Sequence, residues 1–296
     1  MNKILSNKKT IAWLVVPGLL VIFAGIVFPI GMSVYLSLTD QQGGAVSNFI
    51  GLKNYLEIFT ADKTFWKSVM HSVFLALGLI CIQHPLCILF AILLDKIGGR
   101  AEKIFRILLF IPCIISIMVT SKMWINILNP TFGMLNKVLK TVGLSSICQN
   151  WLSDPDYVLG CIIFIVMWQG FGYGMLIYYA GVKGISSDIN EACAIDGARG
   201  FSKFFRVTFP LLMPVIIVNV TLALISALKE MEIIYLITDG GPGDSSQFVA
   251  NYLYQMAFRN YKYGYANAIS VIFVIICLLV TILYHRALRI GQGDAT

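Results

Sequence analysis

Long apolar stretches alternate with short polar segments along the whole chain. A helix needs about 20 apolar residues to cross a bilayer. Stretches of that length predict membrane spans over residues 11–36, 69–94, 104–128, 157–182, 211–234 and 265–288. The pattern therefore predicts an all-α integral membrane protein with six transmembrane helices.

Composition supports a chain that lies in a bilayer. Hydrophobic residues make up 58% and charged residues 12% of the sequence, and the mean hydropathy is +0.80. These values are too apolar for an ordinary soluble domain. The net charge of +7 comes from short basic clusters beside apolar runs, which anionic lipid explains better than nucleic acid. No nucleic-acid partner is expected.

The distribution of lysine and arginine predicts the orientation of the spans. With the N-terminus inside the cell, the inner segments carry most of the basic residues, as the positive-inside rule requires. The first stretch is longer than a signal-peptide core and has no small-residue cleavage site, so it predicts a retained span. The expected organisation is a cytoplasmic N-terminus (1–10), a transmembrane region (11–290) and a cytoplasmic tail (291–296).

A polar segment, residues 186–210, separates the fourth and fifth stretches. It opens with three possible N-cap residues ending at Asp188, and Glu191 follows Asp188 at capping-box spacing. Gly197 comes near the end of the helical pattern, where glycine permits a left-handed turn. We therefore predict two short helices at an angle, with Pro210 breaking the pattern at the membrane boundary.

The spacing of this segment resembles a known family motif. Glu191-Ala192-Cys193, Gly197 and Val207-Thr208-Phe209-Pro210 are similar to the EAA loop, E-A-A-x3-G-x9-I-x-L-P, of bacterial ABC-importer permeases. The departures keep small or apolar side chains. The resemblance implies a cytoplasmic helix that seats in a cleft of an ATP-hydrolysing subunit, whereas the alternative is an ordinary interfacial helix. The implied coupling residues are Glu191, Ala192, Cys193, Asp196, Gly197, Ala198, Phe204 and Pro210.

Four further motifs resemble those of carbohydrate-importer permeases of the maltose and multiple-sugar type. They are FIGLKNY (49–55), NPTFGMLN (129–136), DGGP (239–242) and YGYA (263–266). The resemblance implies a type I ABC importer permease fold in the bacterial plasma membrane. It also implies a second homologous permease, two ATP-binding subunits, an extracellular solute-binding protein and a carbohydrate substrate. Importers of this type contain two different permeases, and the GGP turn resembles the one found in the first of them.

Enzymatic chemistry is not evident in the sequence. The histidines have no partners at metal-ligand spacing, and the cysteines include no C-x-x-C pair. No phosphate-binding G-x-x-x-x-G-K-[ST] loop is present. We expect no catalytic residue, no metal site and no disulfide, and we expect ATP and magnesium to bind the partner ATPase rather than this chain.

Aromatic and polar residues in the fourth and fifth spans are candidates for contact with a sugar. Such residues can instead form the interfacial aromatic belt or connect helices. Lys229, Glu230 and Glu232 lie near the outer end of the fifth span, where Lys229 and Glu232 can form an interfacial pair or the charges can line a cavity. Gln83-His84-Pro85 predicts a bend in the second span. The candidate substrate-pathway residues are Trp168, Gln169, Tyr173, Tyr178, Asn219, Ser226, Glu232 and Tyr235.

Two alternatives stay open at this point. Within the same class, the substrate could be glycerol phosphate or another polyol. In a different class, the chain could be a stand-alone secondary transporter, which should show ionisable pairs at mid-span or repeats of broken helices. Neither feature is evident here. A partner ATPase that purifies with the chain would separate the classes.

Overall fold

The computed structural model describes residues 8–44 and 47–293, so the predictions for residues 1–7 and 294–296 lie outside it. The chain divides into two compact units. The first combines Met1–Asp62 with Leu253–Ile276, and the second combines Lys63–Tyr252 with Cys277–Thr296. Within the described ranges the chain is helical, apart from loops and one isolated bridge between Thr39 and Phe49. The predicted all-helical fold is confirmed.

The helices of the first unit build the first span and one end of the last. They are α2 (Lys8–Ile22), the π turn η1 (Phe23–Val27), α3 (Phe28–Ser37), α4 (Lys53–Thr60), the π turn η5 (Gln255–Arg259) and the beginning of α16 (Tyr263–Gly293). Asn54 Nδ2 donates to the carbonyl oxygens of Ser37 and Thr39 at 2.8 and 2.9 Å. A Cβ on Gly264 would lie 2.1 Å from the Thr39 oxygen, so only glycine fits there. Two of the family-like motifs therefore meet at Thr39.

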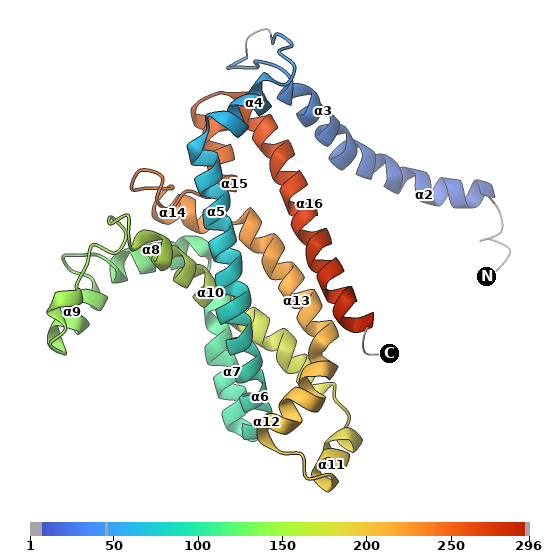
Figure 1. Cartoon of the computed structure of the whole chain (residues 1–296), viewed down its shortest axis with the longest axis vertical. Coiled ribbons are helices and arrows are strands. Elements are labelled where there is room, and N and C mark those ends of the chain that lie inside the picture. Colours follow the sequence, from blue (N-terminus) through green and yellow to red (C-terminus); the bar gives the residue numbers. More distant parts are fainter. Residues whose placement is uncertain (1–7, 45–46, 294–296) are drawn as a thin grey trace. The chain divides into compact units, whose positions relative to one another are not determined.

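The second unit holds most of the remaining spans (Figure 1). Its helices are α5 (Lys63–Gly78), η2 (Leu79–Gln83), α6 (His84–Ile97), α7 (Gly99–Ile114), α8 (Ile117–Ile127), α9 (Met134–Thr141), η3 (Ser145–Ile147), α10 (Val158–Lys183), α11 (Ser187–Ile195), α12 (Gly200–Lys203), η4 (Phe204–Thr208), α13 (Phe209–Lys229), α14 (Glu232–Ile237) and most of α15 (Val249–Tyr254). In this unit α10 packs against α6, α7 and α13.

Five helices of the described chain are long and apolar enough to cross a membrane, and a sixth span results if α7 and α8 are taken together. The five are Ile11–Ser37, Lys63–Ile97, Val158–Lys183, Gly200–Lys229 and Tyr263–Tyr284. Each contains most of a span predicted from the sequence. The first, second, fourth and sixth predictions are confirmed, whereas the third and fifth need correction.

The prediction of one continuous third span, 104–128, is wrong. α7 and α8 meet at a bend of 96° (Figure 1). Ile115 and Ser116 between them are extended, with ψ of 131° and 138°. Pro112 lies in the last turn of α7 and has no N–H to donate to the preceding turn. The helix ends shortly after it, and the Ile115 carbonyl accepts a hydrogen bond from Gln169 Nε2 at 3.2 Å instead.

The predicted limits of the fifth span are also wrong. The helix begins at Gly200 and ends at Lys229, and Glu230 has an extended backbone with ψ of 122° before α14 begins. Lys229 and Glu232 therefore lie on different helices, and the predicted pairing across one helical turn does not occur. α12, η4 and α13 form one span of 30 residues, Gly200–Lys229. The predicted second short helix is the first turn of this span.

Three prolines follow π turns in the same register. Each proline is the second residue after a π turn: Pro29 follows η1, Pro85 follows η2 and Pro210 follows η4. In each turn a backbone N–H donates to the carbonyl five residues earlier, and this wider turn relieves the clash that a proline ring makes in an α-helix. The break predicted at Pro210 is wrong for this reason. At the bend predicted near Pro85 the structure has the turn η2, and Lys63–Ile97 continues as one span.

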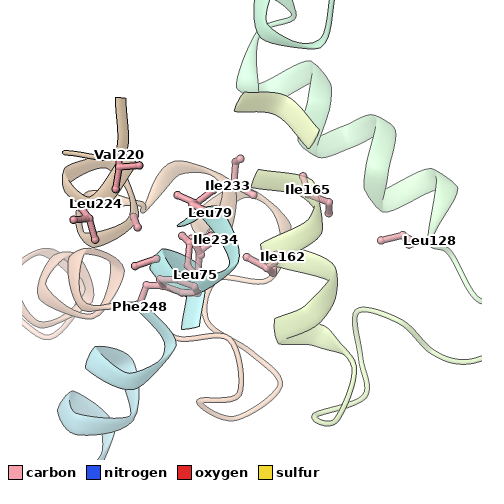
Figure 2. Packing of buried hydrophobic residues seen from close by; sticks show 12 residues of the cluster. Leu75, Leu79, Leu128, Ile162, Ile165, Val220, Leu224, Ile233, Ile234 and Phe248 are labelled. Carbon is pink, nitrogen blue, oxygen red and sulfur yellow. The ribbon is translucent and has the colours of Figure 1, made fainter. Parts of the chain in front are cut away.

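Apolar side chains from four helices and one loop form the core of the second unit. Figure 2 shows Leu75, Leu79, Ile162, Ile165, Val220, Leu224, Ile233, Ile234 and Phe248 from this cluster. Small residues let the helices approach closely: a Cβ on Gly172 of α10 would lie 2.5 Å from the Leu109 oxygen of α7. In a bilayer such packing, rather than water exclusion, holds helices together. It fixes the walls of the site described below.

The loop after α14 is the tight turn that the sequence predicts. Gly240 has φ of 91° and Gly243 has φ of 57°, and the Gly241 N–H donates to the Thr238 oxygen at 3.0 Å. A Cβ on Gly240 would lie 2.3 Å from Gln247 Oε1. Glycine is therefore required at Gly240 both by the backbone and by the packing.

Candidate functional site

The polar segment 186–210 begins with α11, whose start agrees with the sequence prediction. Ser186 is the N-cap residue, but no side chain caps the helix. The predicted capping box between Asp188 and Glu191 is therefore wrong. Asp188 lies in the first turn, where its negative charge is favourable beside the positive end of the helix dipole.

Gly197 closes α11 with a Schellman motif. Its φ is +70°, its N–H donates to the Ala194 oxygen at 3.3 Å, and the Ala198 N–H donates to the Cys193 oxygen at 2.9 Å. Both bonds need a left-handed residue after the helix, which glycine adopts without steric cost. The left-handed turn predicted at Gly197 is confirmed.

The predicted coupling residues divide into one buried side chain and a largely exposed remainder. Cys193 is 6% exposed. Two large apolar side chains of the same segment point outward: Ile195 is 86% and Phe201 84% exposed. Exposed apolar residues in a polar segment suit contact with another protein. Glu191, Ala192, Asp196, Gly197 and Pro210 are exposed, and Ala198 and Phe204 are partly buried.

A cavity of about 380 Å³ lies among the helices of the second unit. Four of the predicted pathway residues line it: Gln169, Tyr173, Asn219 and Ser226. They come from α10 and α13, and residues of η2, α6, α7, α8 and α14, together with Glu230, complete the wall. The two helices that carry the predicted residues are those joined by segment 186–210.

Hydrogen bonds fix several polar groups of the cavity. Asn219 Nδ2 donates to the Gly174 oxygen at 3.2 Å, and His84 Nδ1 lies 2.7 Å from the Tyr178 hydroxyl. Gln169 donates through Nε2 to Ile115, but its buried Oε1 has no hydrogen-bond partner. A buried acceptor without a donor is costly. Gln169 lines the cavity, but its Oε1 atom is shielded from the cavity by surrounding groups.

The other predicted pathway residues lie elsewhere. Trp168 packs edge-on against Trp124, with ring centroids 5.4 Å apart. Tyr178 is fully buried behind His84. Glu232 and Tyr235 line a separate pocket of about 500 Å³ near the α7–α8 break. These four do not line the cavity.

Sequence reasoning missed two polar residues of the cavity, Gln83 and His84, which were interpreted only as groups near a proline kink. For Glu230 the sequence left open a place at the membrane interface or in a cavity wall. The break after Lys229 places Glu230 in the cavity wall. Across the described residues, no group of three His, Cys, Asp or Glu side chains could hold a metal ion.

Residues 87–289 match the family described as "Binding-protein-dependent transport system inner membrane component". The chain belongs to this family. It is 31% identical to the "Probable ABC transporter permease protein YurN" of Bacillus subtilis, over 98% of this chain and 99% of that protein. It is also 31% identical to the "Trehalose/maltose transport system permease protein MalF" of Thermococcus litoralis, covering 94% and 92% of the two chains. The resemblance inferred from the motifs is confirmed.

A solved structure shows the same fold. It is described as a "bacterial ABC transporter involved in the import of the acidic polysaccharide alginate", and it aligns with a TM-score of 0.81 at 19% identity. The alignment covers 94% of this chain and 96% of the other. This inner membrane component therefore has the all-helical fold of an ABC importer permease and is a multi-pass membrane protein.

Proposed function

We propose that the chain is one of two permease subunits of an ABC importer that passes a sugar or oligosaccharide across the bacterial plasma membrane. The observation that carries this proposal is full-length similarity to sugar permeases. Besides MalF, the chain is 32% identical to the "Multiple sugar-binding transport system permease protein MsmF" of Streptococcus mutans, over 96% of each chain.

The partners follow from the family and from the exposed segment. The permease pairs with a second, homologous permease, and two ATP-binding subunits supply ATP and magnesium. An extracellular solute-binding protein delivers the sugar. One support is a solved neighbour of like fold, described as in complex with an "alginate pentasaccharide-bound periplasmic protein". The basic residues of the inner segments support cytoplasmic termini and a cytoplasmic segment 186–210.

The structure suggests how this segment would transmit movement. α11 lies between α10 and the continuous helix Gly200–Lys229. Both helices carry cavity residues: Gln169 and Tyr173 lie on α10, and Ser226 lies about 40 Å along the second helix from Gly200 at 1.5 Å per residue. Displacement of α11 by the ATPase therefore moves two walls of the cavity together.

This coupling would produce alternating access to the cavity. Nucleotide can shift the equilibrium between two conformations only through a difference in affinity for them. Tight seating of α11 supplies that difference, because the ATPase binds the segment in one orientation of the flanking helices. The sugar then leaves toward the cytoplasm when the walls separate on the inner side.

Purification with its partners tests the proposed function. The tagged chain, expressed with its neighbouring subunits and extracted in mild detergent, should retain an ATPase and a second permease. Cells with this complex should take up at least one of a panel of labelled sugars and polyols, and a variant of the ATPase that does not hydrolyse ATP should not. Uptake that persists without the ATPase would instead support a stand-alone secondary transporter.

A further inference from the structure

The cavity of the second unit has an acidic wall. Glu230 lines it, and no lysine or arginine is among the described residues that do. His84 also lines it, and its Nδ1 lies 2.7 Å from the Tyr178 hydroxyl. Among the described residues of the wall, Glu230 supplies the carboxyl group; burial raises the pKa of this carboxyl above its ordinary value, and the hydrogen bond from the Ile233 N–H opposes the rise.

The backbone break after α13 directs Glu230 to this position. The helix ends at Lys229, and the extended Glu230 precedes α14, whose Ile233 N–H donates to Glu230 Oε1 at 3.3 Å. Neither of the ion pairs Arg106–Glu102 and Lys183–Asp95 involves Glu230. A carboxylate at membrane depth usually faces a water-filled cavity.

Groups of the wall that accept hydrogen bonds favour molecules that donate them. Ser226 lines the cavity one helical turn before Glu230. The hydroxyl groups of a sugar can donate to the Ser226 oxygen and to the carboxylate. A phosphate or carboxylate group would instead meet a like charge with no cation to offset it.

We propose that Glu230 makes this cavity selective against anions, so that the transported substrate is an uncharged carbohydrate rather than a uronic acid or a sugar phosphate. The substrate part of this inference rests on the proposed function. The fold does not determine this property, because a solved transporter of the same fold is described as importing an acidic polysaccharide. The proposed selectivity therefore depends on side chains in the cavity wall.

Charged thiol reagents report the electrostatic potential in the cavity, and the experiment does not require the substrate to be known. In the purified complex, Ser226→Cys is labelled with methanethiosulfonates of equal size, one carrying trimethylammonium and one carrying sulfonate. Peptide mass spectrometry quantifies labelling at position 226, so the native cysteines can stay. The ratio of the two rates reports the local charge, because the reactivity of the thiol itself affects both rates equally.

We expect Glu230→Gln to lower the cation-to-anion ratio by about tenfold. A unit charge about 6 Å away across water changes each rate about threefold, and the two changes have opposite signs. Glu230→Asp keeps the charge and should keep the ratio high. Glu232→Gln, in the neighbouring pocket, should change the ratio less. A ratio that Glu230→Gln leaves unchanged would overturn the proposal.

Two further measurements separate this inference from the proposed function. At Ser146→Cys, in the exposed turn before α10, the ratio should not respond to Glu230→Gln. In cells, the native complex should import neutral sugars but not glucuronate or glycerol 3-phosphate. Import of either anion would overturn the assigned substrate class. If no sugar of any charge is imported, the proposed function fails while the labelling ratio still reports the charge of the cavity.

Discussion

The helices α9 and α11 end in the same way but are connected to the rest of the protein differently. Gly143 follows α9 with φ of +81°, and the Leu144 N–H donates to the Leu139 oxygen at 2.8 Å. Gly197 follows α11 with φ of +70° and the equivalent bond to Cys193. At both glycines an added Cβ would meet no other atom within 4 Å. The two helices therefore end with the same backbone conformation and the same hydrogen bond.

Exposure does not separate these helices either. Val142, the C-cap residue of α9, is 61% exposed, as Ile195 of α11 is exposed. The difference lies in the connections: α11 joins α10 to the continuous helix Gly200–Lys229, and both carry cavity residues. α9 follows α8 and is separated from α10 by a turn of 3-10 helix and a loop. The comparison teaches that connection to the cavity, rather than local structure, marks the coupling helix.

The largest contrast is expected from a bulky residue at each glycine. Gly197→Leu and Gly143→Leu each place a side chain in a left-handed conformation, which costs about 1–2 kcal/mol. Uptake of the transported sugar should fall about tenfold or more for Gly197→Leu and stay near the native rate for Gly143→Leu. Western blots of membranes should show both variants at similar levels. Equal loss of uptake in the two variants would mean that the closure at Gly197 has only a structural role.

Charge reversal on the two helices should give a somewhat smaller contrast. Glu191 and Lys140 are exposed residues of α11 and of the last turn of α9. Removal of a charge pair at an interface costs about 2–5 kcal/mol if the pair is buried there. Glu191→Lys should therefore weaken retention of the ATPase in a pull-down, whereas Lys140→Glu should not. Full retention with Glu191→Lys would rule out an essential contact at this carboxylate.

Truncation of exposed apolar side chains should separate docking from stability. Phe201→Ala and Val142→Ala remove surface groups and should change the stability of this chain by no more than about 0.5 kcal/mol. Only Phe201→Ala should weaken binding of the ATPase, measured as the detergent-stable fraction of the complex. If the melting temperature of the isolated chain falls by many degrees, Phe201 is a packing residue rather than a docking residue.

The smallest effect is expected at Cys193. Its side chain is nearly buried in α11, and cysteine there behaves as a small hydrophobic residue. Cys193→Ala removes one sulfur atom and keeps the helix propensity high, so uptake should stay close to the native rate. Cys193→Leu adds volume at a buried site and should reduce uptake. A strong loss with alanine would indicate a specific role for the thiol.

Sequence alone predicted the features that depend on local patterns. Apolar runs located most of the spans, because a membrane helix must satisfy its own backbone hydrogen bonds over a fixed length. The EAA-like spacing identified the family, and Gly197 identified the end of α11. Each of these depends on residues close together in the chain.

The sequence did not predict features that depend on packing between helices. At the break between α7 and α8, the free carbonyl oxygen of Ile115 accepts a hydrogen bond from Gln169, which lies 54 residues away in the sequence. No local sequence pattern predicts such a distant partner. For Glu230 the sequence left a cavity lining open, but the helix end at Lys229 that accompanies this position was not predicted. Pro210 was interpreted as a helix breaker because the π turn that accommodates it is not evident from composition.

Crosslinking tests the central claim most directly. Cysteines placed at Glu191 and, as the matched control, at Lys140 are combined with single cysteines on the surface of the partner ATPase and oxidised in native membranes. We predict a disulfide-linked band from position 191, changed by ATP, and none from position 140. The absence of any crosslink from position 191, or an equal one from position 140, would contradict the proposal that α11 couples this permease to the ATPase.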